Sequence, residues 1–343
     1  MDVETAKKVL SDSGLFKVLE RIESRKQYSN ANGDLKVLIC DTETTGLRIE
    51  DGEKVIEVGA ILLSFDSETG QPVEVLEEYQ SLEDPGFDMT EKVIKLHNIS
   101  NEMVKGKTFD EKGLLSITEQ ADLIVCHNSG FDRPFLEDRF PFFKGKRFGC
   151  SLADIDWIDN GYDGSSLTVI ALGQNKFYEA HRAVMDCYAL ADVLAEKLPQ
   201  QDTFPLKNIL DKSKEMIYLI GAFRSKFEDK EILKKEGFSW FAEDKTWAKS
   251  AFGAAEAKQT VEFLHKNIYA TSEPLDLQLK TYSSEKRFSI DVSKEPFRIH
   301  RTQGVSKDIL QETKKDEGGT VKKPYPLGGG KSILSRISKP NQF

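Results

Sequence analysis

The chain has 343 residues, of which 39% are hydrophobic and 31% are charged, and its net charge is −9. This composition is typical of a folded, water-soluble protein with room for one large domain and a smaller one. It excludes a membrane-spanning protein, because no apolar run approaches the ~20 residues that cross a bilayer. The acidic charge also argues against a protein that attracts nucleic acid with its whole surface.

The amino-terminal residues 1–33 are predicted to form a charged, amphipathic helical segment. They lack the continuous apolar centre of a signal peptide. The four cysteines are widely spaced and form no CxxC pair, which predicts small buried thiols in a reducing cytosol rather than a zinc site. We therefore expect a cytoplasmic protein with no membrane partner.

Residues 34–200 carry the pattern of a large α/β domain. Strands are predicted at 35–40, 54–65, 73–82 and 121–126, the second and third forming a hairpin. Helices are predicted at 89–100, 109–121, 165–177 and 182–198. Three consecutive strands followed by strands mixed with helices indicate a mixed sheet flanked by helices.

The pattern breaks at 201–213, which we interpret as a linker. Residues 214–271 then predict a small α+β domain: a strand, a short Lys-rich helix, an aromatic hairpin and a helix. Residues 272–343 are predicted to be a largely disordered tail. From Lys286 onward the tail has 13 Lys or Arg against 6 Asp or Glu, a local +7. Such an arm either holds nucleic acid or binds a protein partner.

Two carboxylates, Asp41 and Glu43, stand one residue apart where the first strand ends. Alternate residues of a strand face the same side, so the two carboxylates are expected to point the same way and to repel each other. A shared proton or a bound cation relieves such repulsion. Taken alone, the pair is equally consistent with solvated carboxylates at the rim of a sheet.

Three further titratable residues lie at the ends of predicted elements. Asp132 follows the strand at 121–126, and His181 and Asp186 stand at the start of the last helix of the large domain. Five residues on an ideal helix turn through about 500°, so His181 and Asp186 would not share a helical face. We therefore expect His181 on the loop that enters the helix; on its own, it would be read as a helix cap.

In this order, "DTETTG", "HNSGFD" and "HRAVMD" resemble the three motifs of the DnaQ-like (DEDDh) 3′–5′ exonucleases, which have an RNase H-like fold. The resemblance covers about residues 34–200. It implies a catalytic site of Asp41, Glu43, Asp132, Asp186 and His181. The four carboxylates would hold two Mg²⁺ ions, with Mn²⁺ as a substitute, and His181 would be the general base.

The same resemblance implies a set of substrate-binding residues: Thr44, Thr45, Gly46, Leu47, His127 and Asn128. For the last two we favour a role in ordering the turn that delivers Asp132. The "DTETTG" form of the first motif favours DNA as substrate, with 3′ ends of RNA as the alternative. A non-catalytic nucleic-acid-binding module is a third, less favoured reading, and a GxxxxGK phosphate loop is absent from the sequence.

The small domain resembles a module attached to some bacterial DnaQ-like exonucleases. Its Trp240 and Trp247 predict either a small core or a platform on which single-stranded nucleic acid stacks. In the linker, "QDTFPL" faintly resembles a sliding-clamp binding peptide, which would imply a clamp or DNA polymerase partner. His97 is expected on a loop near the substrate, and His265 and His300 on the surface.

Overall fold

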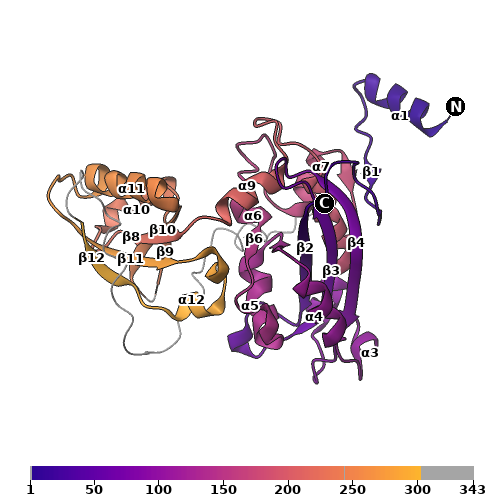
Figure 1. Ribbon diagram of the computed structural model, residues 1–343, viewed down its shortest axis with the longest axis horizontal. Helices are drawn as coiled ribbons and strands as arrows, with labels where there is room; N and C mark the ends of the chain where they lie inside the picture. Colours follow the sequence, from indigo (N-terminus) through magenta and orange to yellow (C-terminus); the bar gives the residue numbers. More distant parts are fainter. Residues whose placement is uncertain (1, 243, 303–343) are drawn as a thin grey trace. The chain divides into compact units, whose positions relative to one another are not determined.

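The structure is a computed structural model that describes residues 2–242 and 244–302 (Figure 1). The chain divides into two compact units between Ser213 and Lys214. The first unit contains all the motif residues that the sequence predicted for the site.

The first unit is built on a five-stranded sheet in the order β4-β3-β2-β5-β6. Its strands are β2 (Leu35–Thr44), β3 (Val55–Phe65), β4 (Pro72–Leu82), β5 (Leu123–Cys126) and β6 (Phe148–Cys150). The long strands β2, β3 and β4 are antiparallel and lie side by side (Figure 1), whereas β5 and β6 run parallel to β2. The predicted mixed sheet is confirmed.

Eight helices follow or connect these strands within the described part of the first unit. They are α2 (Glu91–His97), α3 (Asn101–Val104), α4 (Glu111–Glu119), α5 (Ser129–Arg139), α6 (Ser151–Asp154), α7 (Leu167–Gly173), α8 (Ala183–Leu194) and α9 (Pro205–Lys212). Helix α8 is buried along almost its whole length and packs on β2 and β3. The main core lies between this helix and the sheet, which gives the start of α8 a fixed place over the strands.

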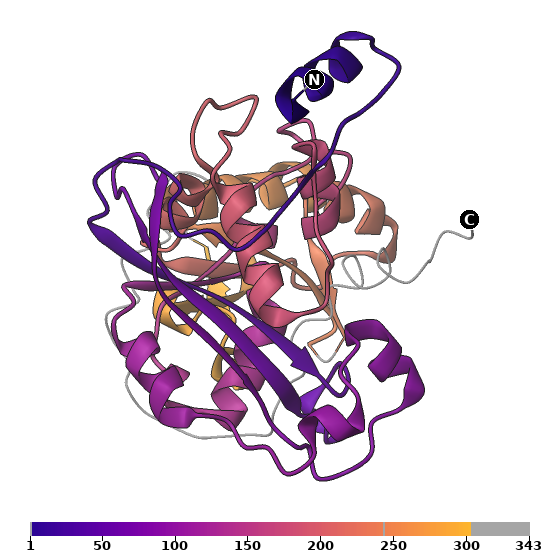
Figure 2. The ribbon, with the colours of Figure 1, turned by 90° about the vertical axis from the view of Figure 1, so that its right-hand side faces the viewer.

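The amino-terminal segment is less helical than predicted. Helix α1 spans only Val3–Asp12 and buries none of its residues, and it stands apart from the rest of the first unit (Figure 2). The chain then runs to β1 (Glu20–Arg21), which pairs in parallel with β7 (Lys176–Phe177). Helix α1 therefore contributes nothing to the core, and its local contacts include the Asp2 cap and the Lys7–Glu20 ion pair at 2.8 Å.

The predicted linker at 201–213 is wrong as a structural description, because most of it is α9. Pro205 occupies the first turn, and Leu206, Ile209 and Leu210 form an amphipathic stripe that is buried in the main core. Leu206 is fully buried, so this segment does not offer an extended clamp-binding peptide.

The second unit has its own five-stranded sheet, in the order β12-β11-β8-β10-β9. Its strands are β8 (Ile217–Gly221), β9 (Ser239–Phe241), β10 (Thr246–Phe252), β11 (Asp276–Tyr282) and β12 (Arg298–Arg301), and its helices are α10 (Lys230–Lys235), α11 (Gly253–Phe263) and α12 (Ile290–Lys294). The aromatic hairpin is β9–β10, and the core lies between the sheet and α10 and α11.

The boundary between the small domain and the tail lies later than predicted. Residues 276–301 add two strands to the sheet, where the sequence predicted disorder. The alternating Leu275, Leu277 and Leu279 supply the apolar face, and pairing with β8 satisfies the backbone. The remainder of the predicted tail lies outside the described residues. His265 is also not a surface residue: it is buried, and its Nδ1 lies 3.0 Å from the carbonyl oxygen of Thr271.

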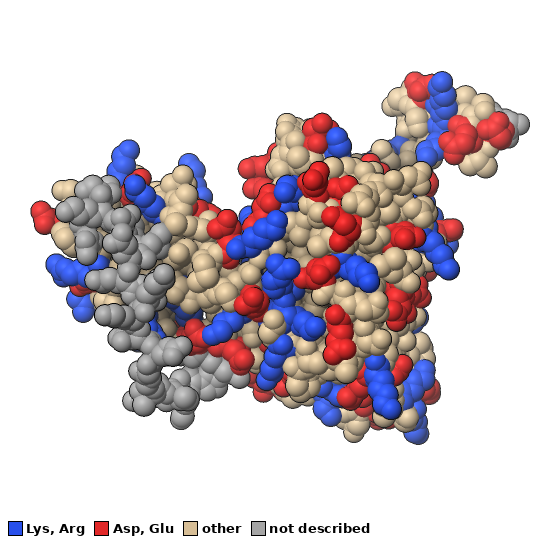
Figure 3. Space-filling view, in the orientation of Figure 1, with Lys and Arg blue, Asp and Glu red and all other residues tan. Residues whose placement is uncertain are grey.

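Charges of both signs are interspersed over the face of the first unit shown in Figure 3. Within residues 2–242 and 244–302, no helix is both long and apolar enough to cross a bilayer. All four cysteines are buried, as predicted.

Candidate active site

Three carboxylates from two elements converge at one end of β2. Asp41 and Glu43 come from the last residues of the strand, and Asp186 comes from the first turn of α8. One oxygen from each lies within 4.8 Å of the other two. The predicted close approach of Asp41 and Glu43 is confirmed, and the fold adds a third carboxylate from far along the chain.

A glycine on the neighbouring strand allows α8 to reach this position. Gly59 of β3 pairs with Asp41 and so lies on the same face of the sheet. A Cβ at Gly59 would lie 2.3 Å from the backbone nitrogen of Val184 and 2.4 Å from the carbonyl carbon of Ala183. Only a strand without a side chain here lets the start of α8 rest on the sheet, which brings Asp186 over Asp41.

The loop before α8 folds back onto Asp186. The backbone N–H groups of His181 and Arg182 donate to Asp186 Oδ2 at 2.9 and 3.1 Å, and the Tyr178 hydroxyl donates to Oδ1 at 3.0 Å. His181 has φ = 70°, a left-handed conformation that this turn requires. The predicted place of His181 on the entering loop is confirmed, and its side chain is exposed.

Glu57 is a site residue that the sequence analysis missed. It pairs with Glu43 across the sheet and is fully buried. Its carboxylate accepts hydrogen bonds from the Gln80 amide (2.7 Å), the Arg182 guanidinium (3.0 Å) and the backbone N–H of Ala183 (3.1 Å). Glu57 therefore ties the first residues of α8 to β3. The available signal was one charged residue inside the apolar run "KVIEVGAILL".

Asp132 lies in the first turn of α5, close to the three carboxylates but outside their 4.8 Å group. Its Oδ1 accepts hydrogen bonds from both the backbone N–H (3.1 Å) and the hydroxyl (2.8 Å) of Thr42. Thr42, the middle residue of "DTE", thus fixes Asp132 against the strand that carries Asp41 and Glu43.

Burial and mutual repulsion make these carboxylates hard to ionise. Burial, followed by the charges of Asp186, Asp132 and Glu43, raises the pKa of Asp41 well above its usual value. Burial, with Asp186 and Glu57 adding to it, raises the pKa of Glu43 to about 8. Burial raises the pKa of Asp132 to about 7, although the hydrogen bonds from Thr42 oppose this shift.

This donor set fits a hard divalent cation. Several carboxylate oxygens face one point, and oxygen ligands are those that Mg²⁺ and Mn²⁺ prefer. The raised pKa values indicate that the positive charge of nearby Arg182 does not balance the carboxylates, so that a bound cation would favour their ionised forms. Asp41, Glu43 and Asp186 could hold such an ion, and Asp132 lies close to them.

Without divalent cations, the protein is expected to lose stability as the pH rises from about 5 to 8. The folded state keeps protons on carboxylates whose pKa values are raised to about 7 and about 8, whereas the unfolded chain releases them near pH 4. The stabilisation is complete below the unfolded pKa and disappears as the pH passes through the folded pKa. Calorimetry in chelator should show a falling melting temperature across this window, and Mg²⁺ should restore at least about 3 °C at pH 8 and little at pH 5. A pH-independent melting temperature would contradict this account.

The residues after the carboxylates form a tight turn at the end of β2. A β-bulge follows Glu43, and the Thr44 hydroxyl donates to the carbonyl of Gly46 at 2.6 Å. Thr45 is bound through its hydroxyl to Glu53 and Lys54, and a Cβ at Gly46 would lie 2.3 Å from the Glu53 side chain. Leu47 remains 63% exposed beside this turn, where an apolar group of a ligand can contact it.

His127 is held by the protein through both ring nitrogens. Nδ1 lies 2.7 Å from the Ser151 hydroxyl, and Nε2 lies 3.0 Å from the Ser165 carbonyl oxygen. Burial lowers the pKa of His127 to about 4, so the ring is neutral at pH 7. These contacts favour the turn-ordering role over direct substrate contact. Asn128 is the residue before α5, and its side chain makes no helix-capping hydrogen bond.

The sequence predicted His97 on a loop, and this prediction is wrong. It is the last residue of α2 and is fully buried, because the left-handed Asn98 ends the helix and turns the chain inward. Its Nδ1 accepts a hydrogen bond from the backbone N–H of Ile99 at 3.0 Å.

The region that carries these residues is similar to known proteins. The family model RNase_T, described as "Exonuclease", matches residues 38–194. DNA polymerase III subunit epsilon from Rickettsia prowazekii is 29% identical over 192 residues, which are 52% of this chain and 81% of that protein. DNA polymerase III PolC-type from Pediococcus pentosaceus is 36% identical over 104 residues, 29% of this chain but only 7% of that longer protein.

Solved structures with a similar arrangement include the nuclease domain of 3′hExo, a DEDDh family member, bound to rAMP (18% identity, TM-score 0.39, 50% of this chain and 96% of that one). Exonuclease X in complex with 5′ overhanging duplex DNA is another (20% identity, TM-score 0.36, 46% of this chain and 89% of that one). The family match spans the strand with Asp41 and Glu43 as well as the helix with Asp186. Residues 38–194 are therefore similar to exonucleases, in agreement with the DnaQ-like 3′–5′ exonuclease that the sequence motifs predict.

Proposed function

We propose that the protein removes nucleotides from the 3′ ends of DNA, preferably single-stranded, and releases nucleoside 5′-monophosphates with the help of two Mg²⁺ ions. The observation that carries this proposal is the convergence of Asp41, Glu43 and Asp186 within 4.8 Å, with Asp132 anchored beside them. The relatives from Rickettsia are named as subunits of a DNA polymerase, which favours DNA over RNA. By the same relationship we propose a cytosolic role in DNA repair or proofreading, with a DNA polymerase as a candidate partner.

In this proposal the carboxylates of Asp41, Glu43, Asp186 and Asp132 hold the cations, which supply positive charge at the scissile phosphate. The protein's own residues position the strand end. Leu47 packs against the terminal nucleotide, and the turn at Thr44–Gly46 fixes the direction in which Leu47 points. The hydrogen bonds from Tyr178 and from two backbone N–H groups keep Asp186 oriented while it is ionised.

His181 is proposed as the general base. The oxygen of a water molecule attacks the phosphorus, its proton passes to the imidazole, and the bond from phosphorus to the 3′ oxygen breaks. The shortened strand leaves with a 3′-hydroxyl, after its oxygen has gained a proton, and the terminal nucleotide leaves as a 5′-monophosphate. The side chain of His181 is exposed, and its backbone is bound to Asp186, so the imidazole can reach a water next to the carboxylates.

The direct test uses matched single-stranded DNA and RNA oligomers labelled at the 3′ or the 5′ end, with Mg²⁺, with Mn²⁺ and with chelator. We expect a metal-dependent ladder that shortens DNA from its 3′ end. A ladder on RNA alone would move the proposal to an exoribonuclease, because the 2′-hydroxyl is the feature that distinguishes the two strands. Cleavage that persists in chelator would contradict the metal-dependent site.

Replacement of His181 by alanine is expected to lower turnover by about 10²–10⁴-fold, the usual contribution of a general base. Affinity for Mg²⁺, measured by titration calorimetry, should stay unchanged, because the backbone N–H of residue 181 still orients Asp186. A loss of metal affinity as large as that caused by Asp41→Ala would instead identify His181 as part of the metal site.

For the second unit we propose that Trp240 stacks on bases of single-stranded nucleic acid. Trp247 packs against the core of this unit, whereas its cross-strand neighbour Trp240 is 44% exposed, with the ring centroids 5.6 Å apart. Lys234, which is ion-paired with Glu231 at 3.1 Å, lies over the Trp247 ring at 5.9 Å. The two tryptophans thus divide the two roles that the sequence left open.

Trp240→Ala is expected to weaken binding of the full chain to a thymidine oligomer about tenfold, the size of one lost base-stacking contact. The binding is measured by fluorescence anisotropy of a labelled oligomer in chelator, so that the strand stays intact. Phe16→Ala, which removes a 60% exposed aromatic residue elsewhere, is the control and should leave affinity unchanged. If Trp240→Ala and the wild type bound the oligomer with equal affinity, the two tryptophans would have a structural role alone.

A further inference from the structure

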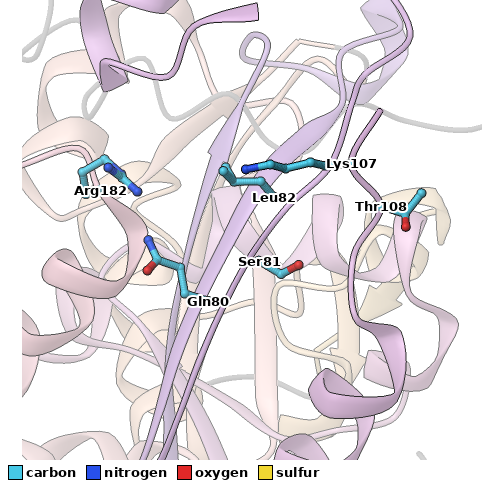
Figure 4. A pocket seen from close by; sticks show the side chains of 6 residues that line it. All are labelled: Gln80, Ser81, Leu82, Lys107, Thr108 and Arg182. Atoms are coloured by element: carbon cyan, nitrogen blue, oxygen red, sulfur yellow. The ribbon is translucent and has the colours of Figure 1, made fainter. Parts of the chain in front are cut away.

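A cavity of about 400 Å³ lies beside the loop that carries His181. Its walls are Gln80, Ser81 and Leu82 at the end of β4, Lys107 and Thr108 between α3 and α4, and Arg182 just before α8 (Figure 4). None of these six residues is a carboxylate. The cavity is therefore lined by two cationic residues, two residues with hydroxyl groups, one amide and one leucine, at the rim of an acidic site.

The two cations of the cavity differ in how they are held. The Arg182 guanidinium is fixed by the buried carboxylate of Glu57, at 3.0 and 3.4 Å, while 39% of its side chain remains exposed. Lys107 is exposed and forms no ion pair within residues 2–242 and 244–302. Figure 4 shows its ammonium group extending past Leu82 towards the side of the cavity occupied by Arg182. The Lys107 ammonium group is therefore available to an anion, which the exposed part of the Arg182 guanidinium can also contact.

One residue of the cavity is adjacent in sequence to the proposed general base. Arg182 directly follows His181, and the backbone N–H groups of both residues bind the same oxygen of Asp186. A nucleic-acid strand carries a phosphate at every nucleotide, so a strand whose 3′ end lies at the carboxylates brings further phosphates near this loop. Arginine and lysine are the residues that bind phosphate oxygens, and hydroxyl groups complete such sites.

We propose that this cavity binds an internal phosphodiester of the substrate strand, upstream of the scissile bond, through Arg182 and Lys107. The proposal rests on the nuclease function proposed above. This contact would let an acidic protein bind a negatively charged strand at one local site. It would also make the affinity for the substrate depend on the length of the strand. Arg182 serves both Glu57 and the cavity, whereas Lys107 serves the cavity alone, so Lys107 is the residue to test.

The test compares Lys107→Gln with Lys105→Gln in the full chain. Lys105 is an exposed lysine two residues earlier that does not line the cavity, so it controls for the loss of one positive charge. On a decamer, Lys107→Gln should raise KM about 3–10-fold and leave kcat unchanged, whereas on a dinucleotide both constants should stay unchanged. The slope of log affinity against log salt concentration should fall in magnitude by about 1. Lys105→Gln should behave like the wild type.

The position of the contact is found with decamers that carry one neutral methylphosphonate linkage. In the wild type, one linkage position should reproduce the KM increase, and in Lys107→Gln that same position should have no further effect. The proposal would be overturned if Lys107→Gln raised KM equally on the dinucleotide and the decamer, or if the effects of Lys107→Gln and the methylphosphonate were additive at every linkage position. It would also be overturned if inorganic phosphate abolished the difference in KM between the two variants on substrates of every length.

The proposal is kept distinct from the nuclease function by a binding measurement. Anisotropy of a labelled decamer, with Asp41→Asn as the background and chelator present, needs no cleavage. A weaker complex for Asp41→Asn/Lys107→Gln than for Asp41→Asn/Lys105→Gln supports the phosphate site even if the wild type cleaves nothing. Equal affinities overturn it even if the wild type is an active nuclease.

Discussion

Replacement of Asp41 by asparagine is expected to lower turnover by at least about 10³-fold, because the Asp41 carboxylate belongs to the cluster that, in the proposed mechanism, would hold the cations and so stabilise transition-state charge. In chelator the same variant should melt at a higher temperature than the wild type. Burial and three neighbouring carboxylates raise the pKa of Asp41, so ionised Asp41 opposes folding at neutral pH, and a neutral amide of the same shape removes that cost.

The two readouts are measured on one preparation, with a labelled DNA oligomer for turnover and calorimetry for melting. Asp186→Asn should follow the same pattern in turnover, while Glu119→Gln, at an exposed site on α4, should change neither quantity. Full turnover in Asp41→Asn or Asp186→Asn would defeat the assignment of the site. Loss of turnover together with a lower melting temperature in chelator would mean that Asp41 supports the fold rather than the metal.

Replacement of Glu57 by alanine is expected to cost about 3 kcal/mol in the free energy of unfolding of the first unit. The change leaves Arg182, half of it buried, without its counter-ion, and removes the acceptor of the Ala183 N–H at the start of α8. Because α8 carries Asp186 and follows His181, turnover should also fall at temperatures where the unit is still folded. Glu57→Gln keeps an acceptor for Ala183 and should recover part of both losses.

Amide hydrogen exchange across residues 181–194 measures the local stability at the start of α8. Unfolding of the second unit does not affect this measurement. In Glu57→Ala these amides should exchange faster, with little change in β5 and β6. Glu119→Ala is the matched control, since it removes an exposed carboxylate. Wild-type exchange and turnover in Glu57→Ala would show that packing on Gly59 alone holds the start of α8.

Local signals in the sequence were sufficient for much of the fold. The hairpin of β3 and β4 follows from two segments rich in apolar and β-branched residues on both sides of a turn, and α8 follows from its helical period. The predictions failed where a local pattern was weak and long-range packing supplied the stability. Helix α9 has only eight residues and is stabilised by the core that Leu206 and Ile209 enter, and β11 is stabilised by pairing with β8.

The sequence by itself determined the identities and the order of the proposed site residues: Asp41 and Glu43 at one strand end, Asp132 after the predicted strand at 121–126, and His181 before the helix that carries Asp186. Strand alternation and helical periodicity act over a few residues, so they can be read without knowing the fold. Only the tertiary structure decided how these pieces meet. Gly59 makes room for α8, Glu57 binds its first residues, and Thr42 holds Asp132. These contacts join residues 90 to 126 positions apart, and such pairs are set by sheet register and core packing rather than by any local pattern.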